Sequence, residues 1–423
     1  MNVAAHHTPS FAAQTLMFSS TALASLGSYY VYDSIGPVAE LLARDLQFTD
    51  TQIGMLNAIY SLPNVILALV GGVLVDRFGA RTVALCTATI SLAGAVITAL
   101  GAHFAVMATG RLIFGIGAET LNVVVCAALA QWFAGRNLAL LFALNTCVAR
   151  LGSYLADVSP SLAGGLYASG WQAPLWLAAG FAALSLASVA VYFVVDRREA
   201  LRGTLLLASP SERVHWRHLF GFGRDYWLLL CTGVAFYSVI FPFRSTFAIK
   251  YLQEADGYTL AHASTLNSYV FLTAAFATPL FGLLADRVGR HATLLVVGSV
   301  LLPVSFLVLA AGRGEAGLAT ALLGVSFSFV PAVLWPAVSR YVSAAKLGTA
   351  YGLLTAAEDG GLTVANVVAG YINDTSGASA ANPAGYAPML EFFGALSFAA
   401  FLCALALKAL ERAPSAALGC ERR

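Results

Sequence analysis

The chain is built from apolar runs of roughly 20 residues that short polar or glycine-containing segments interrupt. An α-helix of about that length crosses the hydrocarbon core of a bilayer. The pattern therefore predicts twelve membrane-spanning helices near 11–40, 52–75, 82–101, 104–130, 137–166, 172–195, 226–251, 261–285, 292–311, 317–342, 346–372 and 387–410. The predicted fold class is an all-α membrane protein with its helices in two six-helix bundles.

Composition agrees with this pattern and excludes several classes of protein. Of the 423 residues, 59% are hydrophobic and 10% are charged, whereas soluble domains are about 25% charged. The formal net charge of +2 is too small for a nucleic-acid-binding surface, so we expect no nucleic-acid partner. The lipid bilayer is the expected environment, and no room remains for a soluble catalytic domain.

Enzymatic and metal-dependent functions find no support. The segment GRGEAG (312–317) matches a dinucleotide-binding pattern, but it joins two predicted membrane helices and follows no strand. The seven histidines form no ligand cluster, and the six cysteines form no C-x-x-C pair. We therefore predict that the chain is not an enzyme and uses no cofactor or metal.

The distribution of positive charge predicts the orientation. If both termini are cytoplasmic, 17 of the 23 Lys and Arg residues lie on that side and three lie outside, as expected from the positive-inside rule. The one long polar stretch, residues 196–225, is predicted to be a cytoplasmic linker. It divides the chain into an N-terminal bundle (1–195) and a C-terminal bundle (226–423).

The two halves repeat a motif. GGVLVDRFGAR (71–81) follows the second predicted helix, and FGLLADRVGRH (281–291) follows the eighth. A parallel duplication of six-helix units places the substrate site between the halves. The motif, together with RLIFGIG (111–117), resembles the major facilitator superfamily. An alternative is that the arginines merely obey the positive-inside rule. The predicted cytoplasmic gating residues are Asp76, Arg77, Arg81, Asp286, Arg287 and Arg290.

Charged residues inside the spans are candidates for function, because each costs about 3 kcal/mol at mid-membrane. Glu119 and Arg150 lie near the centres of the fourth and fifth helices. They are predicted to hold the ammonium and the carboxylate of a zwitterion. The alternative is a structural salt bridge between the two helices.

Other embedded charges are assigned to coupling, gating or pairing. Arg111 is expected to pair with Asp33, and Arg244 follows Pro242, which can kink the seventh helix. Glu358 and Asp359 are adjacent on one helix and point about 100° apart, so at most one faces a cavity squarely. One could accept a cationic side chain or carry a proton; alternatively, one only caps or pairs with a neighbouring helix.

Further candidates could line a substrate pocket or merely pack. They are Tyr29, Tyr32, Asn64, Phe241 and Trp335. The outer side of the cavity is expected to close through apolar contacts between the first, second, seventh and eighth helices.

A narrower resemblance covers nearly the whole chain. It rests on LGSYYVYD (26–33), YSLPNVILALVGGVLVDR (60–77), GRLIFGIGAETL (110–121), ARLGS (149–153), FPF (241–243), LWP (334–336) and LGTAYG (347–352). Together these segments resemble the major facilitator superfamily domain-containing protein 1 family. The resemblance implies a facilitative carrier for dipeptides, including cationic ones, in which Glu119 and Arg150 contact the two ends of the peptide.

The chain departs from that family at three positions. Glu358 and Asp359 stand where the family pattern has Gln-Asn, and Arg244 stands where it has an apolar residue. These changes could alter the preferred substrate charge or add proton coupling. The Ala-rich composition and the short N-terminus without an acidic dileucine signal favour a bacterial inner (plasma) membrane.

The sequence thus predicts a monomeric transporter of small zwitterionic solutes, dipeptides above all, that works by alternating access and by uniport. The principal alternative is a proton-coupled exporter of amino acids or drugs that uses Glu358 or Asp359. A membrane scaffold that transports nothing is a third interpretation.

Overall fold

The computed structural model describes residues 10–133, 138–202, 221–312, 314–343 and 346–412, and these residues are almost entirely helical. No β-strand occurs among them, apart from a single bridge between Ser379 and Asn382. The N-terminal half consists of α1 (Phe11–Asp33), α2 (Ile35–Leu46), α3 (Asp50–Ser61), α4 (Asn64–Phe78), α5 (Ala80–Leu100), α6 (Phe104–Trp132), α7 (Leu138–Leu162), α8 (Gly164–Ala168) and α9 (Gln172–Leu201).

The C-terminal half repeats the plan with more interruptions. It consists of α10 (Arg224–Pro242), the π-helical turn η2 (Phe243–Phe247), α11 (Ala248–Glu254), α12 (Leu260–Val288), α13 (His291–Ala310), α14 (Ala316–Phe329), the π-helical turn η3 (Val330–Leu334), α15 (Trp335–Tyr341), α16 (Leu347–Ser376), the 3₁₀ turn η5 (Pro383–Tyr386) and α17 (Ala387–Arg412). Joined across their breaks, these elements form the twelve predicted spans.

Prolines explain the breaks within spans. Pro37 lies four residues after Asp33, where α1 ends, and Pro63 separates α3 from α4. A proline in a helix removes one backbone donor and clashes with the carbonyl four residues earlier. After Pro242, the helix continues as the π turn that carries Arg244, and such turns are common at functional sites.

Eight helices of the described chain are long and apolar enough to cross a membrane on their own. The spans made of α1–α2, α3–α4, α7 and α16 are not among them. These four spans carry Asp33, Asn64, Arg150 and Glu358. α3 and α4 are each shorter than a full span, because Pro63 interrupts the helix between them.

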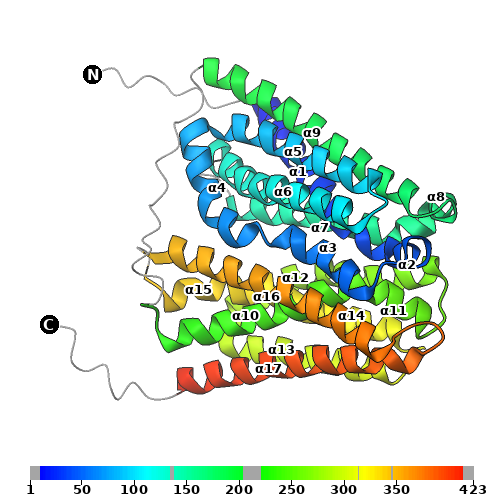
Figure 1. Cartoon of the computed structure of the whole chain (residues 1–423). Helices are drawn as coiled ribbons and strands as arrows, with labels where there is room; N and C mark the ends of the chain where they lie inside the picture. Colours follow the sequence, from blue (N-terminus) through cyan, green and yellow to red (C-terminus); the bar gives the residue numbers. More distant parts are fainter. Residues whose placement is uncertain (1–9, 134–137, 203–220, 313, 344–345, 413–423) are drawn as a thin grey trace, which may run out of the picture.

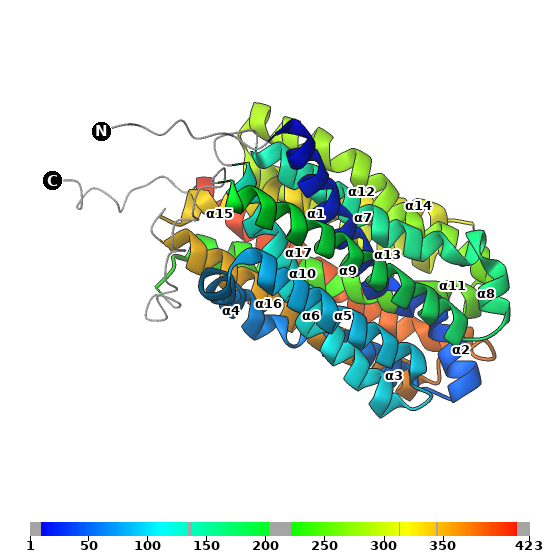
Figure 2. The same ribbon diagram turned by 90° about the horizontal axis from the view of Figure 1, so that it is seen from above.

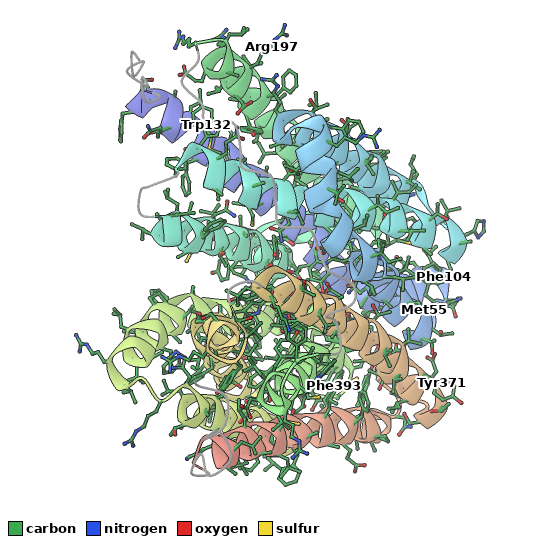
Figure 3. All side chains as sticks on the ribbon, turned by 90° about the vertical axis from the view of Figure 1, so that its left-hand side faces the viewer. Met55, Phe104, Trp132, Arg197, Tyr371 and Phe393 are labelled. Atoms are coloured by element: carbon green, nitrogen blue, oxygen red, sulfur yellow. The ribbon has the colours of Figure 1, made fainter. Side chains whose placement is uncertain are left out.

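Helices of both halves run along a common axis, with the ends of α2, α3, α8 and α11 at one end of the molecule (Figures 1 and 2). We call this end the opposite face. The termini face is the other end, where α1 begins and α17 ends. Figure 3, which views the molecule from the termini face, shows Trp132 and Arg197 in one half and Phe393 in the other.

The halves meet through a few helix pairs. α3 packs against α16, α7 against α12, and α2 against η2 and α11. Glycines permit the closest approach: a Cβ at Gly370 of α16 would lie 2.7 Å from the Cα atom of Thr51, and a Cβ at Gly54 of α3 would collide with the carbonyl of Asn366. The two backbones thus touch near the opposite face.

The helix predicted over 172–195 is longer in the structure, because α9 continues to Leu201. Asp196 is held against the bundle: it accepts a hydrogen bond from Trp132 Nε1 at 2.8 Å and lies 3.5 Å from Arg81. A polar sequence therefore extends the helix instead of beginning a linker. Most of the predicted linker (203–220) lies outside the described residues.

Gly370→Ala is expected to separate the halves at the opposite face, because the added methyl meets the backbone of α3. Nitroxide labels at Arg44→Cys and Glu315→Cys, both on exposed positions of that face, should report a longer distance by pulsed electron resonance when the native cysteines have been replaced. Gly180→Ala is the matched control, since nothing lies within 4 Å of its Cβ position. An unchanged distance in Gly370→Ala would contradict the expectation.

Candidate substrate-binding site and gates

A pocket lies in the N-terminal half between α1, α3 and α6. It is lined by Ser25, Ser28, Tyr29, Tyr32, Tyr60, Ala118, Glu119, Leu121, Asn122 and Val125. Three of the predicted pocket residues, Glu119, Tyr29 and Tyr32, are in this lining. The small side chains Ser25, Ser28 and Ala118 leave the space that the tyrosine rings enclose.

Glu119 faces the cavity and keeps most of its hydrogen-bonding capacity. Its carboxylate accepts one hydrogen bond, at 2.5 Å, from the hydroxyl of Tyr60. A carboxylate has about four acceptor positions, so Glu119 can also bind a cationic ligand. Tyr60 is itself fixed, because its ring stacks on Phe114 and lies 5.2 Å from the guanidinium carbon of Arg111.

Arg150 lies in a cage of aromatic rings. Its guanidinium carbon is 5.1 Å from the ring centre of Tyr29, 5.5 Å from Phe241, 4.9 Å from Phe271 and 5.2 Å from Phe327. These distances are in the range of cation–π attraction. Nη1 is buried and has no hydrogen-bond partner, and no carboxylate in the described part of the chain pairs with this arginine. The alternative of a Glu119–Arg150 salt bridge is therefore wrong for this conformation.

Tyr29 connects the two charged residues. Its side chain lines the cavity next to Glu119 and also stacks against Arg150. Phe241, which was predicted as a pocket residue, contributes to the Arg150 cage instead of the cavity wall. Phe271 and Phe327 were not predicted: single phenylalanines in apolar helices carry no signal until the fold places them around a charge.

The other predicted site residues lie apart from the cavity wall. Asn64 donates to Asp359 at 2.5 Å and so connects the halves, whereas Glu358 is buried inside the C-terminal half. Trp335 stacks on Tyr351, and its carbonyl accepts from the hydroxyl of that tyrosine. The expectation that Trp335 lines the pocket is not met in this conformation, because η3 and α16 hold its ring.

Arg244 joins the halves near the opposite face. It donates to Asp33 of α1 at 2.5 Å and forms a second ion pair with Asp157 of α7. Asn267 of α12 supports this group by donating to Asp157 at 3.0 Å. All three charged residues are about 1% exposed, so the ion pairs are shielded from water.

The predicted pairing of Arg111 with Asp33 is wrong. Arg111 donates to the carbonyls of Val31, Tyr32 and Leu56 and to the side chain of Asn57. The end of α1 and the middle of α3 supply these acceptors, and Asp33 is occupied by Arg244. Arg111 therefore fixes the N-terminal half internally.

A second polar cluster lies closer to the opposite face. Lys250 donates to Asp50 at 2.5 Å, and Asn373 donates to the same carboxylate at 2.8 Å. The carboxylate of Asp374 accepts from the backbone amides of Asp50 and Thr51 at 2.8 and 2.9 Å. An anion at a helix N-terminus is favourable, so α16 caps α3 across the boundary.

The contacts at this face therefore include more than the apolar ones that the sequence suggested. Apolar contacts are present, but ion pairs and helix capping also hold this face closed. The sequence analysis selected neither Lys250 nor Asp50 as a site candidate. Both residues lie near the ends of helices, and only the packing of the halves buries them.

The motif residues at the termini face are arranged differently. Arg77, Arg287 and Arg290 are exposed, and Arg81 pairs with Asp196 of its own half. The side chains of Asp76 and Asp286 lie outside the described residues. Within the described chain, the hydrogen bonds between the halves extend from the opposite face only as far as Asn64 and Asp359. The ion pairs and hydrogen bonds described above close the conformation at the opposite face.

Comparisons with known proteins agree with this architecture. The family model described as Major Facilitator Superfamily matches residues 21–253 and 229–419. The chain belongs to the major facilitator superfamily. It is 33% identical to the lysosomal dipeptide transporter MFSD1 of Danio rerio, over 83% of this chain and 78% of that one. It is 31% identical to MFSD1 of Homo sapiens, with the same coverage of both chains. The family resemblance found in the sequence is confirmed.

More distant proteins share the fold. The probable sulfoacetate transporter SauU of Cupriavidus necator is 23% identical over 81% of this chain and 84% of that one. A variant of the nucleoside transporter NupG superposes with a TM-score of 0.75 at 15% identity, covering 92% of this chain and 99% of that one. This superfamily member is accordingly a multi-pass membrane transporter and not an enzyme.

Arg244→Leu should destabilise the superfamily fold in this conformation, because it leaves Asp33 and Asp157 buried without a counter-charge. Removing one partner of a buried pair costs about 3–5 kcal/mol, which should appear as a lower melting temperature in detergent. The triple variant Arg244→Leu, Asp33→Asn, Asp157→Asn should recover much of the loss.

Arg44→Leu is the control for that experiment. It removes an exposed pair with Asp45, and exposed pairs contribute only about 0–1 kcal/mol. Equal melting temperatures for Arg244→Leu and Arg44→Leu would show that the buried pairs do not stabilise the closed face.

Proposed function

We propose that this protein transports small zwitterionic solutes, dipeptides above all, across the membrane by alternating access. Arg150 binds the carboxylate of the solute, and Glu119 binds its ammonium group. The observation that carries the proposal is the guanidinium of Arg150, which is caged by four rings and retains a buried nitrogen without a partner. A carboxylate fits this site, because guanidinium groups bind carboxylates through two parallel hydrogen bonds.

The aromatic cage makes Arg150 selective for solutes that offer hydrogen-bond acceptors. Rings stabilise the cation and exclude water, so a ligand that cannot supply hydrogen-bond acceptors would leave the guanidinium unsatisfied. Glu119 has spare acceptor positions on the cavity side. Because the two charged groups occupy separate sites, a single amino acid would satisfy only one of them, whereas a peptide with free ends could satisfy both.

The position of Arg150 supports a role in the transport cycle. The residue belongs to α7 of the N-terminal half, but the rings of Phe241, Phe271 and Phe327 come from the C-terminal half. A solute bound to this guanidinium therefore interacts with a site that both halves build. Rocking of the halves would change the cage and the exposure of the bound carboxylate together.

The proposed orientation has both termini in the cytoplasm of a cell with a plasma (inner) membrane, because most Lys and Arg residues lie on the termini face. In that orientation the present conformation is inward-facing, since the opposite face is closed. Asp76, Arg77, Arg81, Asp286, Arg287 and Arg290 would latch the cytoplasmic side in the outward-facing state. The 1–195 and 226–423 bundles would move as units around a central site, and the transporter would act as a monomer.

The family resemblance favours uniport, in which the solute gradient alone drives the cycle. MFSD1 is a lysosomal dipeptide transporter in Danio rerio and Homo sapiens. The chemistry of Glu119 and Arg150 leads to the same class of solute independently. The proton-coupled alternative depends on the acids of α16.

The test is thermal stabilisation of the purified protein by dipeptides, because a ligand that binds only the folded state raises its stability by about 2.7 kcal/mol at 100 times its Kd. Dipeptides with free ends should stabilise the protein, and N-acetylated or C-amidated peptides should do so much less. Arg150→Gln should lose the discrimination between free and amidated C-termini, and Glu119→Gln should lose the discrimination at the N-terminus.

Glu391→Gln is the matched control, since this carboxylate is exposed on α17 and its variant should behave like the wild type. Counterflow of labelled dipeptide into liposomes should be lost in Glu119→Gln and Arg150→Gln. Wild-type counterflow in both variants would refute the two-ended clamp, and stabilisation by single amino acids alone would refute the choice of substrate.

A further inference from the structure

Glu358 is a buried carboxyl group that the proposed peptide site does not use. It lies on α16, it is 1% exposed, and Oε1 has no hydrogen-bond partner. No Lys, Arg or His in the described part of the chain forms an ion pair with it. An ionised carboxylate without a partner in such a place carries a large desolvation cost, which protonation removes.

The surroundings of this carboxyl group are apolar. Gly233 of α10 makes room for it: a Cβ at that glycine would lie 2.7 Å from Oε1 of Glu358 and within 3.5 Å of Leu354 and Leu334. The surrounding core cluster contains Leu229, Val333, Leu334, Val338, Ala350, Leu354, Ala404 and Leu407. Hard metal cations require several oxygen ligands, which these side chains cannot provide, whereas a proton requires none.

Two tyrosines and one acid are the titratable groups that act on Glu358. Tyr226 and Tyr237 approach from α10 and interact with it electrostatically. Asp359, on α16 itself, has the same sign of charge. The hydroxyl of Tyr226 is already engaged with the carbonyl of Ala350 at 2.8 Å. None of these groups can neutralise a carboxylate.

The other helices that pack against α16 bring no counter-charge to this point. From α17 come Ala404 and Leu407, and from η3 comes Leu334. Arg340 of α15 is directed to the carbonyl of Gly289. On the other side of α16, Asn64 of α4 binds Asp359, and Asp50 of α3 lies against Gly370, about three helical turns away.

We propose that Glu358 is a proton-binding site, neutral in the present conformation, and that its proton moves with the solute so that transport is a symport. This coupling rests on the proposed transport function, but proton binding at Glu358 does not. The step is an acid–base equilibrium: the O–H bond of the carboxyl breaks, the electron pair stays on the carboxylate, and the proton passes to water on the side to which the site opens.

Tyr237 and Arg150 provide the connection to the solute. Tyr237 lies about one helical turn along α10 from Gly233, beside which Glu358 is buried, and its ring lies 5.1 Å from that of Phe241 in the Arg150 cage. Gly233, beside which Glu358 lies, and Phe241 of the Arg150 cage are separated by eight residues of α10, or about 12 Å, so the positive charge of an empty Arg150 favours an ionised Glu358. A solute carboxylate at Arg150 cancels this charge, so solute and proton favour each other's binding. This replaces the uniport expected from the family resemblance.

Infrared spectroscopy tests the proton site without any solute. The wild type should show the carbonyl stretch of a buried protonated carboxyl group at neutral pH. The band should be absent in Glu358→Gln and unchanged in Glu391→Gln, which removes an exposed carboxylate. A band that persists unchanged in Glu358→Gln, or that is absent from the wild type, would overturn the assignment.

Proton movement tests the coupling. In liposomes that contain a pH-sensitive dye, inward transport of a net-neutral dipeptide by the wild type should acidify the lumen, and an inward proton gradient should accelerate uptake several-fold. Glu358→Gln should still exchange labelled for unlabelled dipeptide, but its uptake should not respond to the gradient. That exchange also shows that the variant is folded.

The outcomes separate the two proposals. Dipeptide transport by the wild type without acidification, or a response to the gradient that is equal in Glu358→Gln and the wild type, would overturn the coupling and leave the peptide site standing. Absence of dipeptide counterflow in the wild type would instead overturn the proposed function, and the infrared band would then decide the proton site alone.

Discussion

The structure depends on one constraint: a polar side chain inside a membrane must face protein or water, because hydrocarbon offers it no partner. Spans that carry embedded polar residues, such as α3–α4, α7 and α16, therefore pack against the other half of the molecule. The long apolar helices, such as α5 and α13, cover the outside. Arg150 and the ion pairs of the closed face lie at the boundary between the halves for the same reason.

The closed face combines two kinds of contact that a gate needs. Glycines let the backbones of α3 and α16 touch, which fixes the register of the halves. The ion pairs of Arg244 and Lys250 have favourable geometry, but their attraction is offset by the desolvation of both partners. Such contacts specify one arrangement strongly without adding a large net stability, so the face can still open. Removing a single partner is much more costly, because it leaves an unpaired buried charge.

The two charged groups of the proposed site differ in which half of the molecule surrounds them. Glu119 belongs to the interior of the N-terminal half, with Tyr60 as its donor. Arg150 belongs to the same half but is packed among rings of the other. A ligand bound to Glu119 contacts only the N-terminal half, so its binding does not depend on how the halves are placed. A ligand bound to Arg150 lies among rings of the C-terminal half, so its binding does depend on that placement. Glu358 is surrounded by the C-terminal half. Tyr237 lies between Glu358 and the rings around Arg150.

The sequence by itself determined the twelve spans, the twofold repeat, the family and the choice of Glu119 and Arg150 as site candidates. Each of these follows from local information: the length of an apolar run, a repeated motif, or a charge far from the ends of a helix. Only the tertiary structure decided the partners. Arg244 pairs with Asp33 in place of Arg111, Lys250 and Asp50 are buried together, and three phenylalanines from α10, α12 and α14 surround Arg150. These contacts join residues about 90 to 210 positions apart, and helix packing, which no local pattern encodes, brings them together.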